Sequence, residues 1–180
     1  ADSAANVPGM VFYRGRNVPA SEAGVPVSDH GLAYGLGFFE TFRTSGGRAH
    51  AWERHQRRLE SACQRAGMAL PESFLARAAS RREQAIRELL AAHGLDDAVF
   101  RYTITAGPWN SRDGYTAPAE LLALRPLPPP APVEGVTMRL LQLTRDNGEW
   151  LPRPKSLNYA NALLGGHELA RRTERTDDEG

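Results

Sequence analysis

Arg153-Pro154-Lys155-Ser156-Leu157-Asn158-Tyr159-Ala160-Asn161-Ala162 contains the only lysine of the chain, and this stretch gives the first indication of fold and function. Every other position among the 22 Lys and Arg residues is an arginine. A lysine amine, unlike a guanidinium, can lose its proton near neutral pH and attack a carbonyl to form a Schiff base. Lys155 is therefore a candidate nucleophile, although composition alone also accommodates a lone lysine on a solvated surface.

Length and composition describe an ordinary globular chain. The 180 residues are 41% hydrophobic and 24% charged, and the net charge of +1 gives no reason to expect nucleic acid or a membrane surface as a partner. Cys63 is the only cysteine, which excludes an internal disulfide and a CxxC metal site. No stretch approaches the roughly 18 apolar residues of a membrane span, and the start lacks the plan of a signal peptide. We therefore expect a cytoplasmic protein without a structural metal.

The first 125 residues show an alternation of strand and helix patterns. Strands are predicted over 10–13, 18–19, 38–44, 48–52, 99–105 and 119–124, and helices over 52–67 and from 71–73 to 93–94. The segment 29–37 contains three glycines among large apolar residues, which indicates close backbone approach or positive φ angles rather than a plain strand or helix. This pattern predicts a small α+β domain over residues 1–125.

Prolines mark the predicted domain boundary. Residues 126–134 are rich in proline, which favours a stiff extended linker. Beyond it we predict a strand over 136–143 and a helix over 159–172, so residues 135–180 form the start of a larger second domain. One strand and one helix are too few to bury a core. The fold class is accordingly α+β / α/β, with two domains and the second one incomplete in this chain.

Three motifs, taken in order, resemble one family. They are Asp29-His30-Gly31-Leu32-Ala33-Tyr34-Gly35-Leu36-Gly37-Phe38-Phe39-Glu40-Thr41-Phe42-Arg43, then His55-Gln56-Arg57-Arg58-Leu59, then Lys155-Ser156-Leu157-Asn158-Tyr159. Together they resemble the class IV aminotransferases, or fold-type IV pyridoxal-phosphate enzymes, which include branched-chain and D-amino-acid aminotransferases and 4-amino-4-deoxychorismate lyase. The resemblance extends from about Met10 to Gly180 and implies the two-domain fold-type IV architecture.

The resemblance implies pyridoxal 5'-phosphate as the cofactor and gives three residues a role. Lys155 would bind the cofactor aldehyde and, once substrate has displaced it, act as the general base. Arg58 would bind the phosphate through its planar fork of donors, and Tyr159 would hydrogen-bond the ring oxygen. An ordinary surface arginine and an ordinary buried tyrosine are the alternatives for the last two residues.

Other motif residues receive substrate or structural roles. By the resemblance, Tyr34 and Phe39 line the substrate pocket, although both could be plain core aromatics. The segment after the strand that ends at residue 105 offers Arg112 as a possible carboxylate binder, without the Arg-x-His pair of the D-amino-acid enzymes. Glu40 is expected to make a structural hydrogen bond. Asp29-His30-Gly31 is read as a turn rather than a catalytic pair, because no nucleophile motif accompanies it.

The resemblance favours a lyase that forms 4-aminobenzoate and pyruvate in folate biosynthesis, because Phe39-Glu40-Thr41-Phe42-Arg43 is more similar to that branch than to the branched-chain enzymes. The alternative is an aminotransferase acting on a branched-chain or D-amino acid. The family resemblance also implies an amino substrate and a homodimer. The family's acid for the pyridine nitrogen and its phosphate loops would lie beyond Gly180, so a catalytically inactive interaction module is a further alternative. Nucleic-acid binding through the basic helix 52–67 is disfavoured by the low net charge.

Overall fold

The protein is described from a computed structural model in which residues 9–71, 78–130, 138, 140–141 and 155–177 can be described. The chain forms two compact units, one of residues 1–127 with 154–157 and one of 128–153 with 158–180. The first unit thus ends inside the predicted proline linker. It also includes residues 155–157, which we call the Lys155 segment. The predicted assignment of domains to 1–125 and 135–180 stays a prediction.

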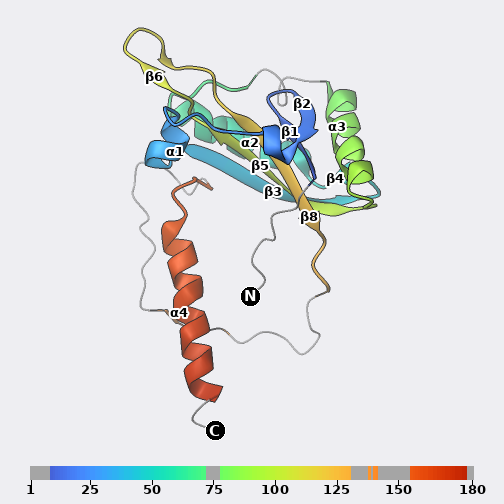
Figure 1. The fold of residues 1–180 in the computed structure, drawn as a ribbon, viewed down its shortest axis with the longest axis vertical. Coiled ribbons are helices and arrows are strands. Elements are labelled where there is room, and N and C mark those ends of the chain that lie inside the picture. Colours follow the sequence, from blue (N-terminus) through green and yellow to red (C-terminus); the bar gives the residue numbers. More distant parts are fainter. Residues whose placement is uncertain (1–8, 72–77, 131–137, 139, 142–154, 178–180) are drawn as a thin grey trace. The chain divides into compact units, whose positions relative to one another are not determined.

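The first unit is built on a six-stranded antiparallel sheet in the order β2-β1-β8-β5-β3-β4. The strands are β1 (Met10–Tyr13), β2 (Arg16–Pro19), β3 (Gly37–Ser45), β4 (Arg48–Ala49), β5 (Ala98–Thr105) and β8 (Glu120–Pro126). Figure 1 shows β3, β5 and β8 side by side through the centre of this unit. The strands predicted over 10–13, 38–44 and 99–105 are confirmed, because β-branched and aromatic residues are concentrated there between glycine-containing turns.

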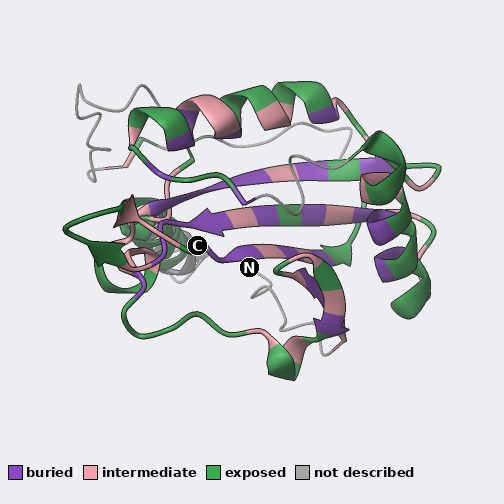
Figure 2. Cartoon of the chain, turned by 90° about the horizontal axis from the view of Figure 1, so that it is seen from above, coloured by how far each residue is buried: buried purple, intermediate pink, exposed green. Residues whose placement is uncertain are grey.

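Helices cover one side of this sheet, which we call the helix face. Along β3 and β5 it carries Phe38, Glu40, Phe42, Phe100, Tyr102 and Ile104, all of them buried. Helix α2 (Trp52–Arg65) packs on β3, and α3 (Ala79–Ala92) contacts β1, β2 and β4. The Phe42 ring meets the Trp52 ring edge-on at 5.3 Å and the Phe100 ring in a stack at 5.5 Å. Figure 2 shows the resulting alternation of buried and more exposed residues along the central strands.

The structure differs from the predicted elements in three places. Residues His30–Tyr34 form a short helix, α1, which the glycine pattern of 29–37 did not predict. Helix α3 begins at Ala79 and not at 71–73, because Ala78 is extended with a ψ of 143°. Residues 109–115 form a small hairpin of β6 (Trp109–Asn110) and β7 (Gly114–Tyr115) that was also missed, because strands of two residues leave no periodic pattern.

Two further expectations concern the C-terminal part. Of the predicted strand over 136–143, only residues 138, 140 and 141 are described, and none of the three is in a strand. The predicted helix over 159–172 is present as α4 (Ala160–Asp177), which is longer than expected at its end. A single-turn 3-10 helix, η1 (Ala20–Glu22), completes the elements. None of the helices described here is long and apolar enough to cross a lipid bilayer.

Candidate functional site

The Lys155 segment is fixed to the first residues of β3. The Phe39 amide donates to the Lys155 carbonyl at 2.8 Å, and the Leu157 amide donates to the Gly37 carbonyl at 2.9 Å. Between these bonds, Phe38 and Ser156 form an antiparallel bridge. A segment more than 110 positions away in the sequence therefore extends the sheet at its outer edge, and its backbone determines where the lysine side chain begins.

The side of the sheet opposite the helix face is called the lysine face, because Lys155 lies there. Successive residues of a strand point to opposite faces, so Phe39 lies on this face while Phe38 and Glu40 lie on the helix face. The Phe39 ring is 5% exposed and has two cations near it, with Lys155 Nζ at 5.9 Å and Arg101 Cζ at 3.6 Å from its centroid. Phe39 was predicted to line the site, and the structure brings it together with Lys155.

Arg101 was missed by sequence reasoning. It lies in the middle of β5, opposite Thr41, and its side chain is exposed on the lysine face. The only signal was a single arginine inside the β-branched and aromatic run 99–105. Alternation along that strand places Arg101 and Val99 on one face and the buried residues Phe100 and Tyr102 on the other.

Glycines allow close backbone approach near the Lys155 segment, as predicted for residues 29–37. A Cβ on Gly37 would lie 2.6 Å from the Ile104 carbonyl oxygen and 2.6 Å from Leu157 Cδ1. A Cβ on Gly31 would lie 2.7 Å from Thr105 Cβ, and Gly35 ends α1 with a φ of 71°. The glycines are therefore required for contact between α1, β5 and the Lys155 segment.

A turn was expected over Asp29-His30-Gly31, but Asp29 is instead the N-cap of helix α1. Its buried carboxylate accepts hydrogen bonds from the Gly31 amide and the Thr105 hydroxyl, both at 2.6 Å, and so caps α1 and joins it to β5. His30 instead contacts the rings of Tyr34 and Tyr115, at 4.8 and 5.5 Å between centroids. Asp29 thus has structural partners, in agreement with the prediction that Asp29 and His30 are not a catalytic pair.

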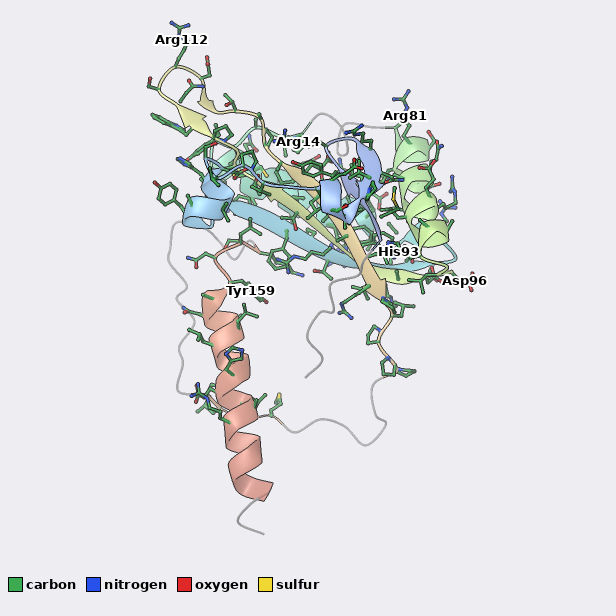
Figure 3. The ribbon with its side chains drawn as sticks, viewed as in Figure 1. Arg14, Arg81, His93, Asp96, Arg112 and Tyr159 are labelled. Atoms are coloured by element: carbon green, nitrogen blue, oxygen red, sulfur yellow. The ribbon has the colours of Figure 1, made fainter. Side chains whose placement is uncertain are left out.

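The other two predicted substrate residues, Tyr34 and Arg112, are both exposed. Tyr34 is the last residue of α1 and is 73% exposed. Arg112 lies at the tip of the β6–β7 hairpin, where its side chain points outward into solvent (Figure 3). The structure does not show Arg112 beside the lysine, and its role as a carboxylate binder stays a prediction, as does that of Tyr34.

Arg58 occupies a polar cluster on the helix face. Its Nε and Nη2 donate to the two carboxylate oxygens of Glu40 at 2.9 and 2.7 Å, and His55 Nδ1 donates to the same carboxylate at 2.7 Å. Burial alone would raise the pKa of Glu40, but the hydrogen bonds from Arg58 and His55 lower it below its ordinary value. Glu40 has the structural role that the sequence predicted, and it fixes the orientation of Arg58.

Arg58 still has capacity for another anion. Glu40 binds two of the five guanidinium N–H donors, and the Arg58 side chain is 51% exposed. Glu40 and Phe39, the partners of Arg58 and of Lys155, are consecutive in β3 and lie on opposite faces of the sheet. Tyr159, the third predicted cofactor residue, belongs to the second unit and directly precedes α4. The phosphate role of Arg58 and the ring-oxygen role of Tyr159 stay predictions.

The described residues contain neither a metal site nor an accessible cysteine thiol. Among the described residues, no group of three or more His, Cys, Asp or Glu side chains could hold a metal ion. Cys63 is fully buried, and burial raises the pKa of its thiol to about 12, so a thiolate nucleophile is disfavoured. Lys155, on the lysine face, stays the candidate nucleophile.

The sequence profile of the class IV amino-transferases matches residues 37–176, which include β3, the Arg58 cluster and the Lys155 segment. The chain belongs to the class IV aminotransferase family. This result confirms the family resemblance and, together with the structural similarities that follow, the expected fold-type IV architecture.

Relatives of this class IV chain include both lyases and aminotransferases. It is 28% identical over 170 residues to the aminodeoxychorismate lyase of Bacillus subtilis, covering 89% of this chain and 55% of the relative. The 4-amino-4-deoxychorismate lyase of Pseudomonas aeruginosa is 30% identical with a TM-score of 0.68, covering 88% of this chain and 56% of that one.

Two solved aminotransferases are also similar. The branched-chain aminotransferase of Thermoproteus uzoniensis, solved with norvaline, is 25% identical with a TM-score of 0.71 and coverages of 90% and 56%. A hypothetical aminotransferase from Mycobacterium tuberculosis in its PLP-bound form is 26% identical with a TM-score of 0.67 and coverages of 92% and 59%. The class IV chain spans about half the length of the curated relatives that it matches.

Proposed function

We propose that this class IV chain carries the lysine of a pyridoxal-phosphate-dependent lyase resembling 4-amino-4-deoxychorismate lyase, forming 4-aminobenzoate and pyruvate. The observation that carries the proposal is the Lys155 segment on β3, where two backbone hydrogen bonds hold the only lysine of the chain beside Phe39. Similarity to two lyases supports the lyase branch. So does the sequence Phe39-Glu40-Thr41-Phe42-Arg43 in β3.

The described residues fit the cofactor of the family, pyridoxal 5'-phosphate. That group needs an amine for its aldehyde and cationic donors for its phosphate. Lys155 supplies the amine on an exposed side chain, and Arg58 supplies guanidinium donors already oriented by Glu40. When bound, the cofactor withdraws electrons from the substrate bonds next to the amine. Lys155 would attach it covalently, Arg58 would bind its phosphate, and Tyr159 would bind its ring oxygen.

In the proposed reaction, residues of this chain would bind and orient the substrate and would move one proton. The freed amine of Lys155 would take a proton from the substrate carbon next to the amino group. Phe39, at 5% exposure, gives the amine an apolar wall, and the Arg101 guanidinium on the same ring adds positive charge.

A second candidate is an aminotransferase, because a branched-chain aminotransferase has a fold as similar as that of the lyase. Lys155 would then transfer the proton from the substrate carbon to the cofactor, and the substrate would leave as a keto acid. Lyase and transferase are distinguished by their products. The experiment incubates the loaded protein with aminodeoxychorismate, or with a branched-chain or D-amino acid and a keto-acid acceptor.

The expected result is 4-aminobenzoate and pyruvate from the first substrate, abolished in both Lys155→Ala and Lys155→Arg. The arginine variant keeps the charge but not the titratable amine. Formation of a keto acid without 4-aminobenzoate would establish the aminotransferase instead. Neither product from wild-type protein whose Lys155 holds the cofactor would contradict both candidates. A cytoplasmic homodimer accompanies this proposal, and sedimentation equilibrium of the purified chain tests the dimer.

A further inference from the structure

His55 contacts the pair of Glu40 and Arg58 from a second side. Its Nδ1 donates to Glu40 Oε2 at 2.7 Å, and Arg58 Nη2 donates to the same oxygen at 2.7 Å. Arg58 Nε donates to the other oxygen, Oε1, at 2.9 Å. His55 Nδ1 and Arg58 Nη2 are 3.0 Å apart, so the imidazole lies directly beside the guanidinium. Arg58 has a role in the proposed function, whereas His55 has none.

Helix geometry explains why the two side chains reach one carboxylate. His55 and Arg58 are three residues apart in α2, and residues at that spacing are neighbours on one face of a helix. This helix packs on β3, to which Glu40 belongs. The His55 ring also lies 5.8 Å from the ring of Phe42, which is on the same strand face as Glu40. His55 is thus held between a core aromatic ring and the carboxylate.

Exposure rises from Glu40 through His55 to Arg58. The side chains are 4%, 16% and 51% exposed, respectively. The Nε and Nη2 edge of the guanidinium is bound to the carboxylate, and within the described part of the chain its Nη1 has no acceptor. A planar guanidinium fixed along one edge presents its other donors in one direction. The carboxylate plane of Glu40 therefore determines where the free donors of Arg58 lie.

The two hydrogen bonds between Arg58 and Glu40 do not fix that plane by themselves. They hold the guanidinium relative to the carboxylate, but the pair can still turn together about the side-chain bonds of Glu40. The hydrogen bond from His55 to Oε2 restricts this rotation, because the imidazole is held against Phe42. Hydrogen bonds weaken steeply when donor and acceptor are misaligned, so a rotating guanidinium would bind an anion less tightly.

We infer that His55 is a positioning residue for phosphate binding by Arg58. It holds the Glu40 carboxylate, and the carboxylate holds the guanidinium with its free edge available for the phosphate. The inference rests on the proposed function, in which Arg58 binds the phosphate of pyridoxal 5'-phosphate. His55 itself need not touch the cofactor.

Binding of pyridoxal 5'-phosphate and of pyridoxal, which lacks the phosphate, tests the inference. Both are titrated by visible absorbance into the full chain freed of cofactor, and the ratio of the two affinities measures the phosphate contribution. We expect His55→Ala to lower this ratio about tenfold and to change the pyridoxal affinity less than about twofold. A folding defect would weaken both ligands together and leave the ratio unchanged.

Three further variants separate positioning from a general effect. His55→Asn keeps an amide N–H near the place of Nδ1 and should stay within about threefold of the wild-type ratio. His50→Ala removes an exposed histidine just before α2 and should leave both affinities unchanged. In the Arg58→Gln background, His55→Ala should cause no further loss, because His55 acts through Arg58.

The inference and the proposed function fail in different ways. An unchanged ratio in His55→Ala, beside a reduced ratio in Arg58→Gln, would overturn the inference alone. So would a further loss from His55→Ala in the Arg58→Gln background, or a ratio as low in His55→Asn as in His55→Ala. An unchanged ratio in Arg58→Gln would contradict the phosphate role of Arg58 and the inference with it.

Discussion

The helix face and the lysine face are made of alternate residues of the same strands, yet they contain different chemistry. On the helix face, Phe42, Phe100 and Tyr102 are buried under α2, and the one acid of β3, Glu40, is satisfied by Arg58 and His55. On the lysine face, cationic side chains surround a single buried ring, Phe39. Strand alternation thus divides one sheet into a side that supplies stability and a side that supplies reactive and binding groups.

This difference would let the lysine face hold the reactive lysine of the proposed function without a loss of stability. Stability comes from apolar contacts on the side that Lys155 does not touch, so changes on the lysine face should affect chemistry more than folding. The Lys155 segment is held to the sheet by backbone hydrogen bonds to β3 and by close packing of Leu157 against Gly37. Four substitutions or reactions test this division of roles, in order of expected effect.

The largest effect is expected from Phe100→Ala on the helix face. Phe100 is 0% exposed and stacks on Phe42, so truncation should lower the free energy of unfolding by about 3–5 kcal/mol. Thr103→Ala, on the lysine face of the same strand, is the control and should cost below about 1 kcal/mol. Urea denaturation at constant m value measures both. Similar losses in the two variants would contradict the assignment of stability to the helix face.

Glu40→Gln should have the next largest effect, and the effect should depend on pH. Removing a carboxylate that accepts from Arg58 and His55 should cost about 1.5–3 kcal/mol at pH 7. The folded pKa of Glu40 is lowered from 4.5, so its contribution is present above the unfolded pKa and is lost as pH falls through the folded pKa.

The difference in unfolding free energy between wild type and Glu40→Gln should therefore shrink below about pH 4.5, the ordinary carboxylate pKa. Denaturation curves from pH 7 to pH 3 measure it. Glu22→Gln, at an exposed position, should follow the wild-type curve. A constant difference across this range would show that the Glu40 charge is not what stabilises the cluster.

Gly37→Ala connects the two faces through the Lys155 segment. The new Cβ would overlap the Ile104 carbonyl and Leu157, so we expect a cost of about 1–3 kcal/mol and separation of the segment from β3. Gly24→Ala is the control, because no atom lies within 4 Å of its added Cβ. Amide hydrogen exchange at Phe39 and Leu157 reports the separation. Wild-type protection at both amides in Gly37→Ala would mean that the segment does not need the glycine.

The smallest effect is expected for chemical modification of Cys63, which should be slow. Burial raises the pKa of Cys63 to about 12, so the fraction of reactive thiolate at pH 8 is small and the sulfur is covered. A thiol reagent should modify the native protein slowly and the urea-unfolded protein rapidly. Rapid modification of the native protein would show a second nucleophile on the helix side of the sheet.

Much of this site was predictable because its residues lie in continuous motifs. The glycines of 29–37, the Glu40 hydrogen bond and the strand of Phe39 are local features that periodicity and backbone sterics express directly. The position of Arg101 beside Phe39 was not predictable, because it depends on which strands are neighbours and in what register. The pairing of Lys155 with Phe39 is a contact between distant segments that no local pattern encodes.

Attachment of pyridoxal 5'-phosphate tests the central claim most directly. Lys155 is the only lysine of the chain, and the other amine of any polypeptide is its terminal α-amine, so borohydride reduction of the loaded protein followed by peptide mapping has few possible outcomes. We predict a visible absorbance band and one reduced cofactor on the peptide containing Lys155, both absent in the folded Lys155→Arg variant. Label on the α-amine alone, or an unchanged band in Lys155→Arg, would contradict Lys155 as the nucleophile.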